Sequence, residues 1–165
     1  MALEFRPIRQ GDWDWIRKIY REGLASGQAS FETEPPNWER WDADHAPNCR
    51  IVALDHGIIV GWAALTPFSS RAVYRGVAEA SVYVASRVRG RGVGSELLGE
   101  LIRCSELAGY WTLLAKIFPE NEASLSLVEK HGFRQVGRLE AFGRHGGRWR
   151  DVILVERRAP RSDAT

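Results

Sequence analysis

Arg89-Gly90-Arg91-Gly92-Val93-Gly94 joins a strand-like run, Glu79 to Val84, to a helix-like run, Ser95 to Ala108. Glycine permits positive φ and lets a ligand approach the backbone closely, and the first turn of a helix carries N–H groups without partners. The partial positive charge at that helix end favours an anion. The segment therefore predicts a phosphate-binding turn, to which Arg89 and Arg91 add full positive charges.

Three kinds of phosphate-binding turn compete for this segment. A nucleotide P-loop requires Gly-x-x-x-x-Gly-Lys followed by Ser or Thr, and that Lys is missing here. A dinucleotide fingerprint requires Gly-x-Gly-x-x-Gly and an acidic residue on the next strand, but residues 112–117 contain none. The coenzyme A pyrophosphate loop, Arg/Gln-x-x-Gly-x-Gly/Ala, is met by Arg89, Gly92 and Gly94. Taken alone, the motif leaves open a plain glycine-rich turn with solvated arginines.

Further segments add to the case for the coenzyme A loop. Asn121-Glu122-Ala123-Ser124 followed by His131-Gly132-Phe133 forms an Asn-x-x-Ser…Gly-Phe pattern, and Ile8 to Leu24 predicts a strand exit and an amphipathic helix. With the glycine-rich turn and the preceding strand, these segments resemble the GNAT N-acetyltransferase superfamily in order along nearly the whole chain. Four segments are similar, more narrowly, to its phosphinothricin, methionine sulfoximine and arsinothricin branch: Ala29 to Pro36, Tyr74-Arg75, Ser81 to Val84, and Gly147 to Val152.

The predicted elements follow the order β-α-α-β-β-β-α-β-α-β-β, which by itself predicts an α/β or α+β sheet. The resemblance implies the GNAT fold, a mixed, mostly antiparallel seven-stranded sheet flanked by about four helices, with splayed fourth and fifth strands around the cofactor. Residues 1–159 are expected to form this single domain, and residues 160–165 a loose tail. The expected strands are 3–6, 49–54, 58–65, 77–84, 111–117, 133–140 and 150–156, and the expected helices are 15–24, 37–44, 95–108 and 121–130. The expected helix caps are Asp12, Asn37 and Asn121.

Composition narrows the class of protein. A net charge of +2 in 165 residues is too small to favour nucleic acid as a partner. No apolar stretch approaches the ~18 residues of a membrane span, and Met1 to Arg6 does not resemble a signal peptide. Cys49 and Cys104 lack C-x-x-C spacing, so free thiols in a reducing compartment are expected. These observations predict a soluble cytoplasmic protein without a metal site. Three tryptophans are expected in the core: Trp15, Trp62 and Trp111.

The resemblance implies direct transfer of acetyl from acetyl-CoA to a primary amine. An amine must lose its proton before it attacks, and Glu79 lies where the branch has its catalytic glutamate, so Glu79 is the predicted general base. A backbone N–H near Val82 or Val84 is expected to stabilise the oxyanion. The residues implied for cofactor binding are Val82, Tyr83, Val84, Arg89, Gly90, Arg91, Gly92, Val93, Gly94, Ser95, Asn121 and Ser124.

The acceptor implied by the resemblance is a small anionic amino acid such as phosphinothricin, methionine sulfoximine or arsinothricin. A guanidinium fork suits a carboxylate or phosphinate, which favours Arg75 as an anchor, with Arg71 nearby. The loop from Gly143 to Trp149 matches one that in relatives often reaches across a dimer, so a homodimer is expected. The residues implied for acceptor binding are Phe31, Glu32, Arg71, Tyr74, Arg75, His145 and Trp149.

One departure from the superfamily concerns the general acid. Val128 stands where relatives have Tyr or His, and His131 lies one helical turn later, which favours a cap or surface histidine. Two alternatives follow. The chain could acetylate another amine, such as a peptide N-terminus, a polyamine or an aminoglycoside, or it could be a non-catalytic acyl-CoA-binding module. The presence of Glu79 favours an enzyme.

Overall fold

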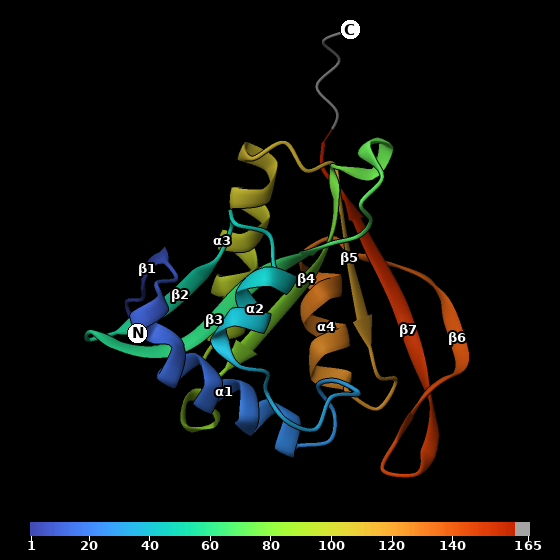
Figure 1. Ribbon diagram of the computed structural model, residues 1–165, viewed down its shortest axis with the longest axis horizontal. Coiled ribbons are helices and arrows are strands. Elements are labelled where there is room, and N and C mark those ends of the chain that lie inside the picture. The colour runs from blue at the N-terminus through green and yellow to red at the C-terminus, as the bar shows by residue number, and fades with distance from the viewer. Residues whose placement is uncertain (161–165) are drawn as a thin grey trace, which may run out of the picture.

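A computed structural model describes residues 1–160, which form one seven-stranded sheet in the order β1-β2-β3-β4-β5-β7-β6 (Figure 1). Of the tail expected at residues 160–165, only Pro160 lies inside the described residues. The strands are β1 (Glu4–Pro7), β2 (Ile51–Asp55), β3 (Ile58–Pro67), β4 (Val77–Val84), β5 (Thr112–Ile117), β6 (Arg134–His145) and β7 (Arg148–Arg158). The helices are α1 (Trp13–Ala25), α2 (Trp38–Asp44), α3 (Val93–Leu107) and α4 (Glu122–Lys130), with 3-10 turns η1 (Gln10–Asp12), η2 (Ala72–Tyr74) and η3 (Ser86–Val88).

The sheet is mixed and mostly antiparallel, as predicted. The pair β4–β5 is parallel, whereas the other neighbouring strands run antiparallel. Within the described part of the chain, β4 and β5 pair only from Val77–Thr112 to Glu79–Leu114, and beyond Glu79 no rung joins them. The expected splay of the fourth and fifth strands is therefore confirmed, and it leaves one edge of β4 without a partner strand.

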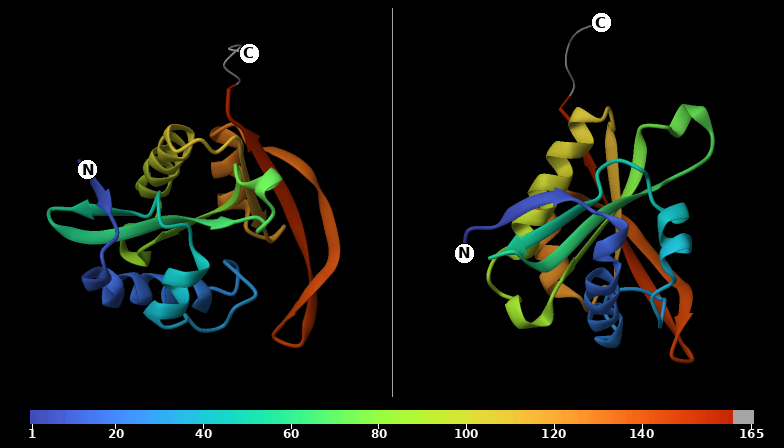
Figure 2. Two further views of the ribbon diagram at one scale, coloured as in Figure 1. Left: turned by 45° about the horizontal axis from the view of Figure 1, so that its top comes forward. Right: turned by 60° about the vertical axis from the view of Figure 1, so that its left-hand side comes forward.

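Helices cover both faces of the sheet (Figure 2). α1 and α2 lie on one face, and α3 packs on the other face against β2, β3 and β4. The inner strand β3 is buried on both sides, which explains its nearly continuous apolar sequence. On the α1 side Trp62 stacks on Tyr83 with ring centroids 4.8 Å apart, and on the α3 side Gly61 lies directly under Leu97.

Local sequence signals place most helix ends correctly. The side chain of Asn37 accepts a hydrogen bond from the Arg40 N–H at 2.9 Å and caps α2. Asn121 accepts from the Ser124 N–H at 3.1 Å and caps α4. Asp12 precedes α1, but its side chain does not cap the helix. Its carboxylate instead accepts a hydrogen bond from the Arg9 N–H and pairs with the Arg6 guanidinium at 2.7 Å. That pairing lowers the pKa of Asp12.

The prediction of two free thiols is wrong. Cys49, just before β2, and Cys104, on α3, form a disulfide with Cα atoms 5.7 Å apart, although they are separated by 55 positions in the sequence. Spacing along the chain could not reveal this pair, because the packing of α3 over β2 brings the two residues together. Disulfides persist mainly in oxidising compartments, so the thiol argument for a reducing one no longer holds.

The tryptophan predictions are confirmed only in part. Trp62 is fully buried, but Trp15 lies on the outer side of α1 with 44% of its surface exposed, and Trp111 is half-buried. The prediction that Trp15 lies in the core is wrong. The buried face of α1 is formed by residues such as Ile16 and Ile19, and Trp15 lies on the other face. None of the helices within residues 1–160 is long and apolar enough to cross a bilayer.

Candidate active site

A cleft of ≈ 1000 Å³ opens where β4 and β5 diverge. Its walls come from the end of α1 and the following loop, from β4 and β5, and from the first turns of α3 and α4. A volume of this size suits a cofactor with a second small molecule beside it. Fourteen residues predicted from the sequence line it: Phe31, Glu32, Glu79, Val82, Tyr83, Val84, Arg89, Gly90, Gly92, Val93, Gly94, Ser95, Asn121 and Ser124.

The other predicted residues lie outside this cleft: Arg71, Tyr74, Arg75, Arg91, His145 and Trp149. The Arg75 guanidinium carbon lies 5.5 Å from the centre of the Trp111 ring, and Arg75 donates a hydrogen bond to the Ala72 carbonyl at 3.1 Å. Trp149 is 61% exposed on β7. Arg75, the residue predicted to anchor the acceptor, therefore contacts Trp111 and Ala72 outside the cleft in this structure.

The start of α3 is open to an anion. Its N-cap, Gly92, has φ of 85°, in the left-handed region that disfavours side chains, and it provides no side-chain cap. The first turn of α3 therefore lines the cleft without a side-chain cap on its N–H groups, and the exposed Arg89 also lines the cleft. A Cβ at Gly92 would meet no atom within 4 Å, so the glycine is needed for its backbone angle and leaves room for a ligand. These features fit the pyrophosphate of coenzyme A.

Glu79 occupies the fork between the two diverging strands. It pairs with Thr66 of β3 and with Leu114 of β5, and Leu114 is the last residue of β5 that pairs with β4. Its Oε2 lies 3.4 Å from the Nζ of Lys116. The carboxylate is about one-third exposed, so a solute in the cleft can reach it.

A wall of stacked aromatic rings borders the α1 side of the cleft. Tyr83 stacks on Tyr20 and on Trp62, each at 4.8 Å between ring centroids, and the Tyr20 hydroxyl donates to Glu32 at 3.0 Å. Burial raises the pKa of both tyrosines above the usual range. Both phenols therefore stay protonated at neutral pH and can act as hydrogen-bond donors.

The loop that carries Phe31 and Glu32 is held in place by Arg150. Its guanidinium donates to the Gly27 carbonyl at 2.5 Å and to the Gln28 side chain at 2.9 Å, and it lies 3.7 Å from the centre of the Phe118 ring. The sequence analysis missed this residue, because its two partners in the loop lie more than 100 positions away and no local motif marks such a contact.

Neither Val128 nor His131, the two residues that the sequence raised for the general acid, places a proton donor in the cleft. Val128 is buried and lines the cleft, whereas His131 lies outside it with its Nε2 2.9 Å from the Ser95 Oγ. Burial and the charges of Lys130 and Arg157 lower the pKa of His131. His131 thus bridges the ends of α4 and α3. No group of three or more potential metal ligands occurs among residues 1–160.

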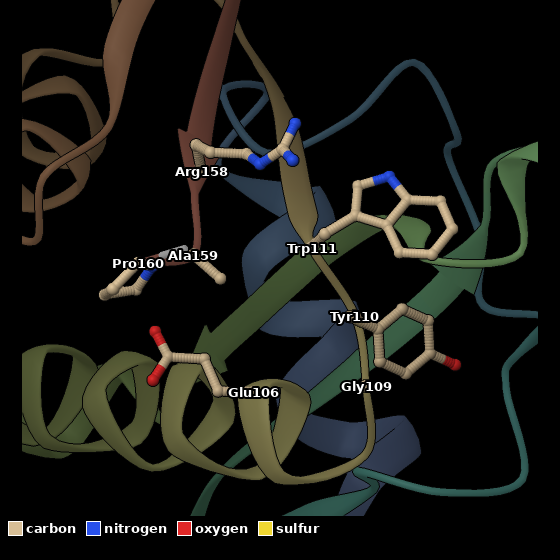
Figure 3. Close-up of a pocket in the computed structure, with 7 residues that line it drawn as sticks. All are labelled: Glu106, Gly109, Tyr110, Trp111, Arg158, Ala159 and Pro160. Atoms are coloured by element: carbon tan, nitrogen blue, oxygen red, sulfur yellow. The ribbon is translucent and has the colours of Figure 1, made fainter. Parts of the chain in front are cut away.

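A second pocket, of ≈ 410 Å³, lies at the opposite end of β5 (Figure 3). Figure 3 shows the Tyr110 and Trp111 rings on one side, with Arg158 across from Trp111 and Glu106 below. The carboxylate of Glu106 pairs with Arg157 at 2.7 Å. None of the residues predicted as site residues lines this pocket, so the cleft at the fork is the better candidate.

Comparison with known proteins found similar sequences and similar solved structures. The model of the acetyltransferase (GNAT) family matches residues 13–133. A phosphinothricin N-acetyltransferase from Alcaligenes faecalis is 34% identical, covering 99% of this chain and 86% of its own. An L-methionine sulfoximine/L-methionine sulfone acetyltransferase from Pseudomonas paraeruginosa is 30% identical over 94% of each chain. A phosphinothricin acetyltransferase from Sinorhizobium meliloti, solved in complex with AcCoA, is 30% identical with a TM-score of 0.88, covering 100% of this chain and 92% of the other.

Proposed function

Because this chain belongs to the GNAT family of acetyltransferases, we propose that it transfers acetyl from acetyl-CoA to the primary amine of a small anionic amino acid. Phosphinothricin, methionine sulfoximine and arsinothricin are acceptors of this class. Relatives named for the first two align along nearly the whole chain. The observation that carries the proposal is Glu79, a carboxylate at the fork of β4 and β5 within a cleft large enough for both substrates.

The cofactor is acetyl-CoA, which supplies an activated acetyl thioester when bound. The residues present fit it. Arg89 and the open first turn of α3 would hold the pyrophosphate by charge and by backbone N–H groups. The edge of β4 from Val82 to Val84, which has no neighbouring strand among the described residues, offers backbone groups to the rest of the molecule.

Glu79 acts as the general base in this proposal. The amine of an amino acid is mostly protonated at neutral pH, so its proton must leave before nitrogen attacks. Glu79 accepts this proton directly or through one water molecule. A backbone N–H near Val82 or Val84 then stabilises the negative charge that develops on the carbonyl oxygen.

Solvent returns a proton to the leaving thiolate. Val128 has no proton to give. His131 lies outside the cleft, where its ring contacts the Ser95 hydroxyl. A thiol has a pKa of roughly 8.5, so its thiolate leaves without an acid far more readily than an alkoxide would. The valine is therefore compatible with turnover.

The proposal includes a homodimer. Large apolar side chains are exposed on the β6–β7 hairpin, where Val136, Phe142 and Trp149 are each about half exposed or more. Such surface is costly in water unless another chain covers it. Light scattering on the purified protein would report twice the chain mass if the proposal holds, and one chain mass would contradict it.

A thiol-release assay with acetyl-CoA tests the proposed function. The panel comprises phosphinothricin, methionine sulfoximine, arsinothricin, a polyamine, a peptide with a free N-terminus and an aminoglycoside. We expect thiol release with the anionic amino acids. Faster release with another amine would replace this acceptor class, and acetyl-CoA binding without release for any amine would leave a non-catalytic acyl-CoA-binding module.

A further inference from the structure

Two side chains with a permanent positive charge line the cleft within the described residues, Arg89 and Lys116. Arg89 belongs to the glycine-rich turn at the start of α3, where it serves the cofactor. His45 also lines the cleft, but burial lowers its pKa, so it is neutral near pH 7. The carboxylates of Glu32 and Glu79 lie in the same cleft. Of the basic side chains that line the cleft, Lys116 is therefore the one available to bind an anionic acceptor.

Lys116 is placed at the fork by the pleat of β5. It lies two residues beyond Leu114, the last residue of β5 paired with β4, and so points to the same face as Leu114. Its neighbours Ala115 and Ile117 point to the other face and are buried in the core. The Lys116 Nζ lies 3.4 Å from the Glu79 Oε2, on the face of the sheet where Tyr83 meets α1.

The ion pair between Lys116 and Glu79 is too exposed to stabilise the fold appreciably. The side chains of Lys116 and Glu79 are 46% and 32% exposed, and ion pairs of that kind add little to the free energy of unfolding. Exposure also means that a dissolved molecule can reach both charges. The pair thus presents a cation and an anion side by side on the wall of the cleft.

We propose that Lys116 binds the α-carboxylate of the acceptor while Glu79 receives the proton from its α-amine. This inference rests on the proposed function and specifies its acceptor as an α-amino acid. Standard bond lengths put the amine nitrogen and the carboxyl carbon of an α-amino acid about 2.5 Å apart. A single zwitterion therefore fits against both charges, its ammonium group beside Glu79 and its carboxylate beside Lys116.

The resemblance to known enzymes pointed instead to Arg75 as the anchor of the acid. In this structure the Arg75 guanidinium lies against Trp111 and outside the cleft, whereas Lys116 contacts the predicted base. A second explanation of Lys116 is that it only neutralises Glu79. An acceptor without a carboxylate separates the two explanations, because neutralising Glu79 would affect every amine equally.

The test compares two acceptors in two variants. Lys116→Met removes the charge and keeps much of the chain length, and Lys130→Met does the same at an exposed lysine at the end of α4. Each is assayed by thiol release with L-methionine sulfone and with its α-carboxamide. A charged hydrogen bond left unmade weakens binding roughly 10- to 100-fold, so kcat/KM of Lys116→Met should fall by that factor for the amino acid, mainly through KM.

The α-carboxamide should show no more than about a twofold change in Lys116→Met, and Lys130→Met should behave as wild type with both acceptors. Lys116→Arg should recover part of the amino-acid activity by restoring the charge. Equal losses with both acceptors, no loss with either, or a wild-type enzyme that prefers the carboxamide would each overturn the role of Lys116 and leave the acetyltransferase intact. Absence of thiol release from wild type with every amine would instead sink the proposed function, and this inference with it.

Discussion

Glu79 owes its position to the register of two strands at once. Pairing with Thr66 on one side and Leu114 on the other fixes its backbone, and the loss of pairing immediately afterwards opens the cleft in front of it. A carboxylate one pleat earlier would lie between paired strands, and one placed later would lie over the unpaired edge of β4. At the scale of single residues, the chemistry therefore depends on where a ladder of hydrogen bonds stops.

Glu79→Gln should keep the affinity for acetyl-CoA and slow acetylation at neutral pH. General-base catalysis is typically worth ~10²–10⁴-fold, and the amide cannot accept the proton. The deficit should shrink as pH rises, because more of the acceptor amine is then already free. Thiol-release rates between pH 6 and 9, with calorimetry for acetyl-CoA, measure both quantities.

Glu140→Gln is the matched control for that substitution, since Glu140 is an exposed carboxylate on β6 outside the cleft. It should leave the rate unchanged across the pH range. A Glu79→Gln protein that matches wild type at pH 7 would remove Glu79 from the proposed mechanism.

At the scale of elements, α3 carries two separate constraints at its two ends. Its first turn requires a left-handed backbone at Gly92 and an uncapped set of N–H groups. Twelve positions after Gly92, within α3, Cys104 ties the helix to the segment before β2. Between these ends Leu97, Leu98 and Leu101 are buried against the sheet. The helix is thus anchored by its apolar face while its first turn stays open to the cleft.

Gly92→Val should abolish acetyl-CoA binding. A β-branched residue disfavours φ of 85°, and its side chain would project into space meant for the pyrophosphate. Isothermal calorimetry measures the affinity, and the melting temperature reports whether the variant is folded.

Gly57→Val provides the comparison for backbone strain. Gly57 has φ of 78° and, like Gly92, would meet no atom with a new Cβ, but it lies in the hairpin between β2 and β3. We expect similar losses of stability in the two variants and loss of affinity only in Gly92→Val. Wild-type affinity in a folded Gly92→Val protein would exclude this turn as the pyrophosphate site.

At the scale of the whole molecule, contacts between distant segments hold the cleft in shape. Arg150 of β7 donates hydrogen bonds to Gly27 and Gln28, and Asn121 donates to the Gln28 carbonyl at 3.2 Å, so the loop after α1 is tied both to β7 and to the cap of α4. The disulfide ties α3 to the segment before β2. These ties join the loop on the α1 side of the sheet to α3 and α4, whose first turns line the cleft.

Loss of the disulfide should lower stability and spare cofactor binding. Closing a loop of 55 positions is worth about 2–4 kcal/mol, mainly through the unfolded chain, which corresponds to a drop of roughly 5–15 °C in Tm. The double variant Cys49→Ser/Cys104→Ser should show this drop, as should reduced wild type. Acetyl-CoA affinity should stay within about twofold, because the bond is remote from the first turn of α3.

The same reductant added to the double variant controls for unspecific effects and should not change its melting temperature. A wild-type melting temperature that is indifferent to reductant would contradict a stabilising role for the bond.

The sequence alone predicted the features that depend on local backbone conformation. Strand and helix periodicity, the caps at Asn37 and Asn121, and the glycine at position 92 each depend on a few neighbouring residues, so the element order and the glycine turn at the start of α3 could be predicted. The resemblance to a family added the expected position of the base at Glu79.

Only the tertiary structure decided which distant residues meet. The Cys49–Cys104 bond, the Arg150 contacts and the Lys116–Glu79 pair join positions that are 55, up to 123, and 37 residues apart, and they depend on helix packing and strand register. Trp15 and Arg75 show the same limit, since burial and access to a cleft are properties of the assembled sheet. Sequence patterns encode conformations that repeat over a few residues, whereas a contact across the fold exists only once the helices and strands that carry its two residues have packed together.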